Sequence, residues 1–256
     1  MLEAVIFDVD GTLADTEEAH RQAFNATFQE FGLPWDWDQT LYRQLLAVSG
    51  GKERIRHYCT NAHPQWLRGP DADERIAALH KHKTERYAEI VASGGVAPRP
   101  GVRRLIEELQ GAGVRLAIAT TTSLANVASL LENSLSGLPE DTFEVIGAGE
   151  HAADKKPSPA IYDWVLAELA LPPERCLAIE DSENGLRAAL GADLPTLVTE
   201  SCWSQGDDFS GSLAVLSDLG EPEAPFRLLA GALPDGVNGP GWVDVDLLTR
   251  WHRAAV

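Results

Sequence analysis

The chain has 256 residues, of which 44% are hydrophobic and 23% charged, and this composition excludes a disordered or fibrous protein. Lys and Arg number 21 and Asp and Glu 39, so the formal net charge is −18, which disfavours binding to nucleic acid or to an anionic membrane surface. Three scattered cysteines, no apolar stretch near the ~20 residues of a membrane span, and a strand-like run beginning at Leu2 predict a cytoplasmic protein without a targeting segment.

Short apolar runs that are rich in strand formers mark five predicted strands. The first, residues 4–7, is continuous, as is typical of a strand buried on both faces, and polar residues follow it directly. The other runs cover residues 116–119, 143–147, 177–179 and 196–198. Apolar residues recur at helical spacing between these runs, for example over residues 102–109 and 161–169. Strands that alternate with helices predict an α/β fold, a doubly wound parallel sheet with helices on both faces.

The segment after the first predicted strand has a different pattern. It carries helical signals but no strand signals, so we expect an inserted helical cap domain. Asp15 and Glu18 are spaced as a capping pair at the start of its first helix. The predicted division is a core of residues 1–14 and 98–220, a cap of residues 15–97, and a C-terminal extension of residues 221–256. The pattern of the extension fits either added strand structure or a surface wrap.

Polar side chains stand where the predicted strands end, and in open parallel sheets ligands bind at that edge. These residues are Asp8, Asp10, Thr120, Lys156, Glu180 and Asp181. Four carboxylates at one edge repel one another and require a cation, and their hard oxygens suit Mg²⁺. A hydroxyl and an ammonium group suit a phosphate. One carboxylate can attack phosphorus to form an aspartyl-phosphate, and a second can act as general acid and base.

The ordered set of motifs resembles the haloacid dehalogenase-like hydrolase superfamily. The four segments that carry the resemblance are Asp8-Val9-Asp10-Gly11-Thr12-Leu13, Thr120, Lys156-Pro157 and Glu180-Asp181-Ser182. The resemblance implies a Rossmann-like core in which Asp8 is the nucleophile and Asp10 the general acid and base. It also implies catalytic roles for Thr120 and Lys156, although Lys155 competes with Lys156 for that role. Mg²⁺ would be held by Asp8, the Asp10 carbonyl and Asp181, with Glu180 in support.

Further segments are similar to the CbbY-type subgroup of this superfamily. They include Asp15-Thr16-Glu17-Glu18-Ala19-His20-Arg21, Gly50-Gly51-Lys52-Glu53-Arg54-Ile55, His82-Lys83-Thr84-Glu85-Arg86-Tyr87 and Ala119-Thr120-Thr121-Thr122-Ser123. This subgroup accompanies the Calvin cycle and is associated with removal of phosphate from xylulose-1,5-bisphosphate, a by-product that inhibits Rubisco. The resemblance therefore implies a small sugar phosphate as substrate and Mg²⁺ as cofactor.

A bisphosphate carries a second phosphate that the strand-end site does not reach, so cations are expected on the cap. Lys52 and Arg54 offer charge, and Gly51 exposes backbone N–H groups. The further candidate substrate-binding residues are Glu17, His20, Tyr42, Lys83, Thr121 and Thr122. Lys83 shares a helical face with apolar residues, so it could equally extend past them toward solvent.

Several other functions use the same residues. A β-phosphoglucomutase-like phosphomutase and a phosphatase for phosphoglycolate or another monophosphate share the two aspartates. The Gly50-Gly51-Lys52 segment favours the bisphosphate phosphatase. Carbon–halogen hydrolysis is disfavoured because it needs neither Asp10 nor metal-binding carboxylates, and a non-catalytic binding protein would not need the full set of motifs. We expect a monomer that acts on a small molecule and binds neither nucleic acid nor membrane.

Overall fold

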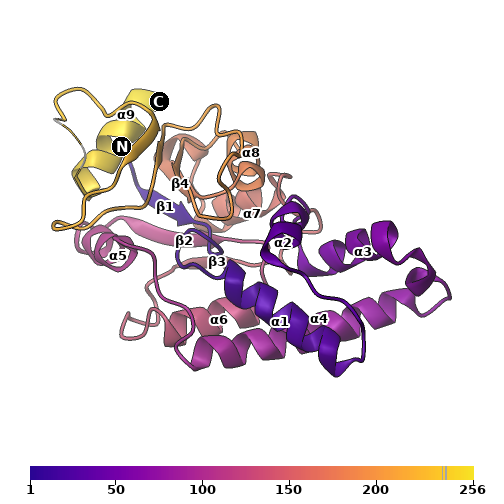
Figure 1. The fold of residues 1–256 in the computed structure, drawn as a ribbon. Coiled ribbons are helices and arrows are strands. Elements are labelled where there is room, and N and C mark those ends of the chain that lie inside the picture. Colours follow the sequence, from indigo (N-terminus) through magenta and orange to yellow (C-terminus); the bar gives the residue numbers. More distant parts are fainter. Residues whose placement is uncertain (238, 240) are drawn as a thin grey trace.

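The computed structural model describes residues 1–237, 239 and 241–256 (Figure 1). One sheet has the strand order β3-β2-β1-β4-β5-β6-β7, and all neighbouring strands are parallel except β6 and β7. The strands are β1 (Ala4–Phe7), β2 (Arg115–Ala119), β3 (Val145–Gly147), β4 (Cys176–Glu180), β5 (Thr196–Thr199), β6 (Ala214–Leu216) and β7 (Leu228–Gly231). The predicted doubly wound α/β fold is confirmed, and all five predicted strands are present.

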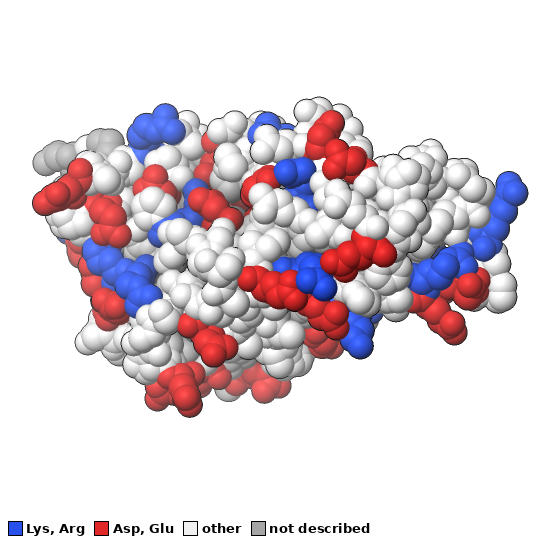
Figure 2. All heavy atoms as spheres, turned by 60° about the horizontal axis from the view of Figure 1, so that its bottom comes forward, with Lys and Arg blue, Asp and Glu red and all other residues white. Residues whose placement is uncertain are grey.

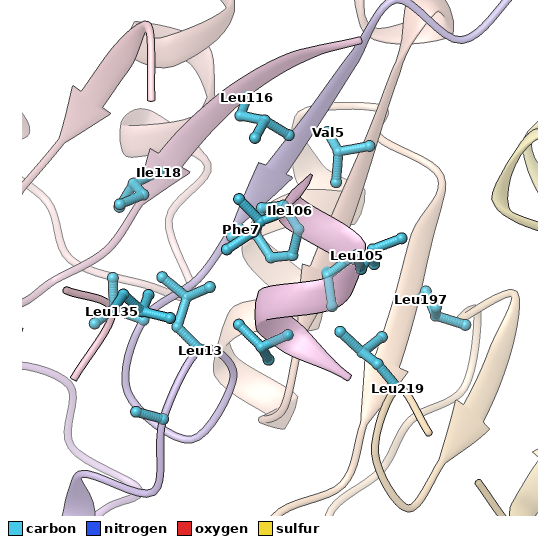
Figure 3. Packing of buried hydrophobic residues seen from close by; sticks show 14 of the residues in the cluster. Val5, Phe7, Leu13, Leu105, Ile106, Leu116, Ile118, Leu135, Leu197 and Leu219 are labelled. Carbon is cyan, nitrogen blue, oxygen red and sulfur yellow. The ribbon is translucent and has the colours of Figure 1, made fainter. Parts of the chain in front are cut away.

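Helices cover both faces of the sheet at its central strands, which explains why residues 4–7, 116–119 and 177–179 are continuously apolar. Alternate residues of β1 enter different clusters: Val5 and Phe7 contribute to one, and Ala4 and Ile6 to the other. Figure 3 shows Val5 and Phe7 beside Leu105 and Ile106 of α5 (Val102–Gly111). The other helices of the core are α6 (Leu124–Asn133), α7 (Ala160–Leu169), α8 (Glu183–Gly191) and α9 (Val245–Ala255), with a short 3-10 helix over Pro173–Arg175.

Between β1 and the core helix α5 the chain forms four α-helices, which lie together at one end of the molecule (Figure 1). They are α1 (Glu17–Glu30), α2 (Gln39–Leu45), α3 (Gly51–Ala62) and α4 (Ala72–Ala92), with a 3-10 helix over Pro64–Leu67. They have a hydrophobic cluster of their own, built around Phe24, Phe28 and Trp37. We refer to them as the cap, and its bounds at residues 15 and 97 stay a prediction.

The capping pair predicted at Asp15 and Glu18 is wrong. Thr16 is the N-cap residue of α1, and its side chain makes no capping hydrogen bond. Its hydroxyl instead donates to Asp10 Oδ1 at 2.6 Å, while the carboxylate of Glu18 pairs with Arg21. The Thr16 side chain therefore bonds to Asp10 instead of capping the N-terminus of α1.

The C-terminal residues combine both alternatives that the sequence left open. β7 extends the sheet beyond β6 as an antiparallel edge strand, and neither β6 nor β7 was among the five predicted strands. Leu248 and Trp251 of α9 join the hydrophobic cluster on the face that α5 covers. The extension therefore buries apolar surface of the core instead of lying loosely over it.

Among the described residues, no helix is long and apolar enough to cross a bilayer. On the face drawn in Figure 2, the Lys and Arg side chains that are described lie between Asp and Glu side chains and form no broad basic surface. A nucleic-acid backbone needs such a surface, and that the chain binds no nucleic acid stays a prediction from its composition.

Candidate active site

The candidate residues meet at the carboxyl edge of the central strands, under the cap. Asp8 follows β1, Thr120 follows β2, Lys156 lies in the loop after β3, and Glu180 and Asp181 come at the end of β4. Parallel pairing of β1 with both β2 and β4 brings these strand ends side by side. A cavity of about 600 Å³ opens between this edge and the cap.

Most of the predicted site residues line this cavity. They are Asp8, Asp10, Glu17, His20, Gly51, Lys52, Arg54, Lys83, Thr120, Thr121, Thr122, Lys156 and Asp181. Glu180 and Tyr42 do not: both are completely buried, Glu180 behind Lys156 and Tyr42 within the cap. The site thus unites residues that are up to about 170 positions apart in the chain.

Lys156 is buried between two carboxylates. Its Nζ donates to Asp8 Oδ1 and to Glu180 Oε1, both at 2.6 Å, and to the Ala119 carbonyl at 2.8 Å. Tyr162 of α7 donates its hydroxyl to Glu180 Oε1 at 2.5 Å. Lys155 instead donates to backbone carbonyls, including that of Ala152 at 3.4 Å. The geometry favours Lys156 over Lys155 as the ammonium group of the site.

The carboxylates of the site are crowded in a low-dielectric environment. Burial raises the pKa of Asp8 to about 8, although the nearby charge of Lys156 opposes the rise. Burial, together with the charges of Asp8 and Glu180, also raises the pKa of Asp181 well above its usual value. Burial lowers the pKa of Lys156, but the two carboxylates outweigh it, and the net pKa is raised. The ionised site therefore has a deficit of positive charge.

This deficit and the donor chemistry fit Mg²⁺. Asp8, Glu180 and Asp181 each offer an oxygen atom, these atoms lie within 4.8 Å of one another, and all three residues are buried. Gly11 has φ +86° and approaches Asp181 so closely that a Cβ atom at this position would collide with its carboxylate. Oxygen ligands and few carboxylates suit Mg²⁺, so these three residues fit the ion; that Asp8, Asp181 and the Asp10 carbonyl are its ligands, with Glu180 in support, stays a prediction.

Asp10 is held by a chain of polar side chains that reaches into the cap. Its Oδ1 accepts from the Thr16 hydroxyl at 2.6 Å and lies 3.0 Å from His20 Nε2. His20 Nδ1 in turn lies 2.6 Å from Lys83 Nζ. Burial would raise the pKa of Asp10, but His20 and Thr16 outweigh it and lower the pKa to about 2. Burial lowers the pKa of Lys83 to about 7.

The loop after β2 presents hydroxyl groups to the cavity. Thr120 Oγ1 accepts a hydrogen bond from the Thr122 N–H at 3.1 Å, which leaves the hydroxyl hydrogen of Thr120 free to point at a ligand. Asn126 donates to Thr122 Oγ1 at 2.9 Å and fixes the second hydroxyl. Ser123 caps α6 by accepting from the Asn126 N–H at 3.3 Å. Thr120, Thr121 and Thr122 thus line the same cavity as Asp8.

The cap side of the cavity carries positive charge. Gly50 is the N-cap of α3, and Lys52 and Arg54 lie in its first turn, so the positive end of this helix opens toward the cavity. Tyr42 lies beneath this wall instead of in it, because its hydroxyl donates to Glu17 Oε2 at 2.8 Å and accepts from Arg54 Nη1 at 3.1 Å. Tyr42 therefore holds Glu17 and Arg54 in place. It does not line the cavity, although the sequence predicted it to be a substrate-binding residue.

Several cavity residues were not predicted. The ring of His80 packs against Gly51 so closely that a side chain at position 51 would collide with it. Arg43 donates to the Cys202 carbonyl at 2.7 Å and Asn184 to the Ala47 carbonyl at 3.1 Å, so both join cap and core across the cavity. His80 lies three residues before Lys83 on α4, and this helical spacing was the available signal. Arg43 and Asn184 carried no comparable signal.

Comparison with known proteins identifies close relatives. A family model for haloacid dehalogenase-like hydrolases matches residues 2–193. Protein CbbY (plasmid) of Cupriavidus necator is 48% identical over 257 residues, which cover 100% of this chain and 98% of that protein. The crystal structure of CbbY from Rhodobacter sphaeroides in complex with phosphate has a TM-score of 0.79 at 48% identity and covers 85% of this chain and 95% of that one. A mutant of the same protein in complex with xylulose-(1,5)bisphosphate gives the same TM-score at 47% identity, with the same coverage.

Proposed function

Because this chain belongs to the haloacid dehalogenase-like hydrolase family and is a phosphatase within it, we propose that it removes a phosphate from a small sugar bisphosphate through an aspartyl-phosphate intermediate. The resemblance of the motifs to this family and to the CbbY-type subgroup is confirmed. The observation that carries the proposal is the buried Asp8 carboxylate, which lies in the cavity wall together with Asp10, Thr120 and Lys156.

Asp8 is the nucleophile. One of its oxygens forms a bond to phosphorus while the bond from phosphorus to the sugar oxygen breaks. Lys156 holds the Asp8 carboxylate at 2.6 Å, and the Thr120 hydroxyl can donate to a phosphate oxygen. When bound, Mg²⁺ supplies positive charge that offsets the repulsion between the phosphate and the carboxylates.

Asp10 moves the protons. It donates a proton to the departing sugar oxygen, and in the second step it accepts a proton from the water molecule whose oxygen attacks phosphorus and frees Asp8. The low pKa of Asp10 favours the ionised form, but a bound phosphate adds negative charge nearby and raises that pKa. The hydrogen-bonded chain from Asp10 through His20 to Lys83 supports this role, because it joins the acid to a buried amine whose pKa is near 7.

The cap supports a substrate with two phosphates. Asp8 and Lys156 serve one phosphate, and the first turn of α3 with Lys52 and Arg54 offers a second anion site on the other wall of the same cavity. Glu17 lines the same cavity, and its second carboxylate oxygen can contact a sugar hydroxyl, whereas both ring nitrogens of His20 already face Asp10 and Lys83. We take xylulose-1,5-bisphosphate as the first candidate, because a similar protein has been crystallised with it.

A substrate panel tests the proposal. Phosphate release is measured with and without Mg²⁺ on xylulose-1,5-bisphosphate, ribulose-1,5-bisphosphate, glucose and fructose phosphates, and phosphoglycolate. We expect Mg²⁺-dependent turnover with a clear preference for xylulose-1,5-bisphosphate. A preference for a monophosphate would overturn the bisphosphate assignment, and conversion of one sugar phosphate isomer to another without phosphate release would favour a phosphomutase. Turnover that is unaffected by EDTA would remove Mg²⁺ from the proposal.

Lys52 is the sharpest probe of the second anion site. Replacing it by Ala is expected to lower kcat/KM for bisphosphates by about 10- to 100-fold, since a hydrogen bond to a charged group contributes roughly 1.5–3 kcal/mol. Monophosphates should lose less than about threefold, because they do not reach this wall. The measurement is kcat/KM for one bisphosphate and one monophosphate in both proteins. The control is Lys81→Ala, an exposed lysine outside the cavity, and equal losses on both substrates would exclude Lys52 from this role.

A further inference from the structure

Arg99 stands out among the described residues outside the cavity, because its buried guanidinium group is bound by backbone carbonyls from three separate segments. Nη2 donates to Glu200 O at 2.8 Å and to Ser217 O at 2.7 Å. Nη1 donates to Thr199 O at 2.7 Å and, by a short hydrogen bond, to the Gly11 carbonyl. The carbonyls of Thr199, Glu200 and Ser217 come from the ends of β5 and β6, which are fixed parts of the sheet.

The fourth carbonyl belongs to a segment of a different kind. Gly11 follows Asp10 directly and lies in the turn of residues 9–16, which we call the Asp10 loop. Arg99 has two further contacts with this loop: its backbone N–H donates to the Leu13 carbonyl at 3.0 Å, and its Nε lies 3.6 Å from Asp15 Oδ1. The Asp10 loop is the first connection from core to cap, and Arg99 itself lies in the second connection. One side chain thus joins both connections to the rigid edge of the sheet.

We propose that Arg99 is a positioning residue that holds the Asp10 loop, so that the Asp10 carboxylate stands where it can protonate the departing oxygen. The proposal rests on the proposed function, in which Asp10 is the general acid. Arg99 does not line the cavity and does not contact a substrate there. It acts through the Gly11–Thr12 peptide unit, one residue beyond Asp10.

Two observations show why the loop needs such a hold. The Gly11 backbone has φ +86° and packs directly against Asp181, so the loop fits in one narrow position, and a small shift away from it would displace Asp10. The loop also has few bonds of its own to the sheet: Gly11, Thr12 and Leu13 donate their N–H groups within the loop. The fork of a guanidinium group can reach carbonyls on both sides at once, which a single ammonium cannot.

The leaving group of the substrate separates positioning from general stability. Protonation of a sugar alkoxide needs the general acid, whereas p-nitrophenolate is a good leaving group and departs without it. The value of kcat/KM reports the steps up to departure of the leaving group. A misplaced Asp10 therefore lowers kcat/KM for a sugar phosphate while p-nitrophenyl phosphate is little affected. A loss of folded protein would lower both equally.

The experiment compares Arg99→Ala and Arg99→Lys with the wild type on p-nitrophenyl phosphate and on the sugar phosphate that the wild type hydrolyses fastest. We expect Arg99→Ala to lose about 10- to 100-fold in kcat/KM on the sugar phosphate and less than threefold on p-nitrophenyl phosphate, in line with the size of general acid catalysis and of misplacement effects. Arg99→Lys should also lose more kcat/KM on the sugar phosphate than on p-nitrophenyl phosphate. This variant serves as the test if Arg99→Ala does not fold.

The matched control is Arg104→Ala. Arg104 also binds several backbone carbonyls, those of Val243, Leu219 and Gly220, but it joins α5 to the C-terminal extension and does not contact the Asp10 loop. Its loss should affect both substrates equally. Equal losses on the two substrates in the Arg99 variants, or the unequal pattern in Arg104→Ala, would overturn the proposal.

A second measurement does not depend on turnover. Hydrogen–deuterium exchange of the amides in residues 11–16 should become at least about tenfold faster in Arg99→Ala and stay unchanged in Arg104→Ala. If the wild type hydrolysed no phosphate ester, the proposed function would fail, but this measurement would still decide whether Arg99 holds the loop. Unchanged exchange in these residues would overturn the positioning role on its own.

Discussion

Replacing Asp8 by Asn is expected to reduce phosphate release by at least about 10⁴-fold. An amide of the same shape keeps the packing after β1, but it cannot form the bond to phosphorus on which both steps depend. The loss should appear in kcat, because the carboxylate is needed for the chemical step and the cap contacts to substrate remain. The measurement is steady-state phosphate release on the best substrate of the panel, together with mass spectrometry of the rapidly quenched enzyme.

The quenched wild type should carry one added phosphoryl group on the peptide that contains Asp8, and the Asp8→Asn protein should carry none. Asp154→Asn is the matched control, because Asp154 is exposed and does not line the cavity. Circular dichroism and binding of a sugar phosphate establish that Asp8→Asn is folded. Turnover of the folded variant at the wild-type rate would show that Asp8 is not the nucleophile.

Replacing Lys156 by Met is expected to impair both catalysis and stability. The variant removes the cation from between Asp8 and Glu180 and leaves two buried carboxylates facing each other. Removing one partner of a buried ion pair typically costs about 3–5 kcal/mol of stability. We expect a loss of this size in the free energy of unfolding at pH 7 without Mg²⁺, and a reduction of kcat by at least about 10³-fold. Urea denaturation and steady-state kinetics measure the two effects.

Addition of Mg²⁺ should restore part of the lost stability, since its charge also neutralises the carboxylates. Lys155→Met provides the comparison, because the neighbouring lysine bonds to backbone carbonyls and lies in the same loop. It should change stability by less than about 1 kcal/mol. A larger loss of kcat in Lys155→Met than in Lys156→Met would reverse the assignment of the two lysines.

The central part of the fold could be predicted from the sequence. The runs of the central strands β1, β2 and β4 are apolar without interruption over residues 4–7, 116–119 and 177–179, and such runs are typical of strands covered on both faces. The strands β6 and β7 were not among the predicted runs, and both form by pairing at one side of the sheet: β6 pairs with β5 and β7, and β7 pairs with β6. Strand structure of this kind depends on partners that lie far away in the chain.

The grouping of the core-site residues could also be predicted from the sequence, because strand ends of a parallel sheet meet at one edge. Asp8, Thr120, Lys156 and Asp181 each follow a predicted strand, so topology alone brings them together. What these residues do in catalysis stays a prediction until the variants are measured. The local assignments near the site were less secure, as the capping pair at Asp15 and Glu18 illustrates.

Tertiary structure alone decided how the cap completes the site. Nothing local in the sequence indicates that Tyr42 lies beneath the cavity wall, or that Arg43 and Asn184 join cap and core. Arg99 is one of several arginines in the sequence, and only the fold brings the ends of β5, β6 and the Asp10 loop to its guanidinium group. The physical reason is that residue type and periodicity report on burial and local backbone, whereas a hydrogen bond between distant segments depends on where the whole chain has placed them.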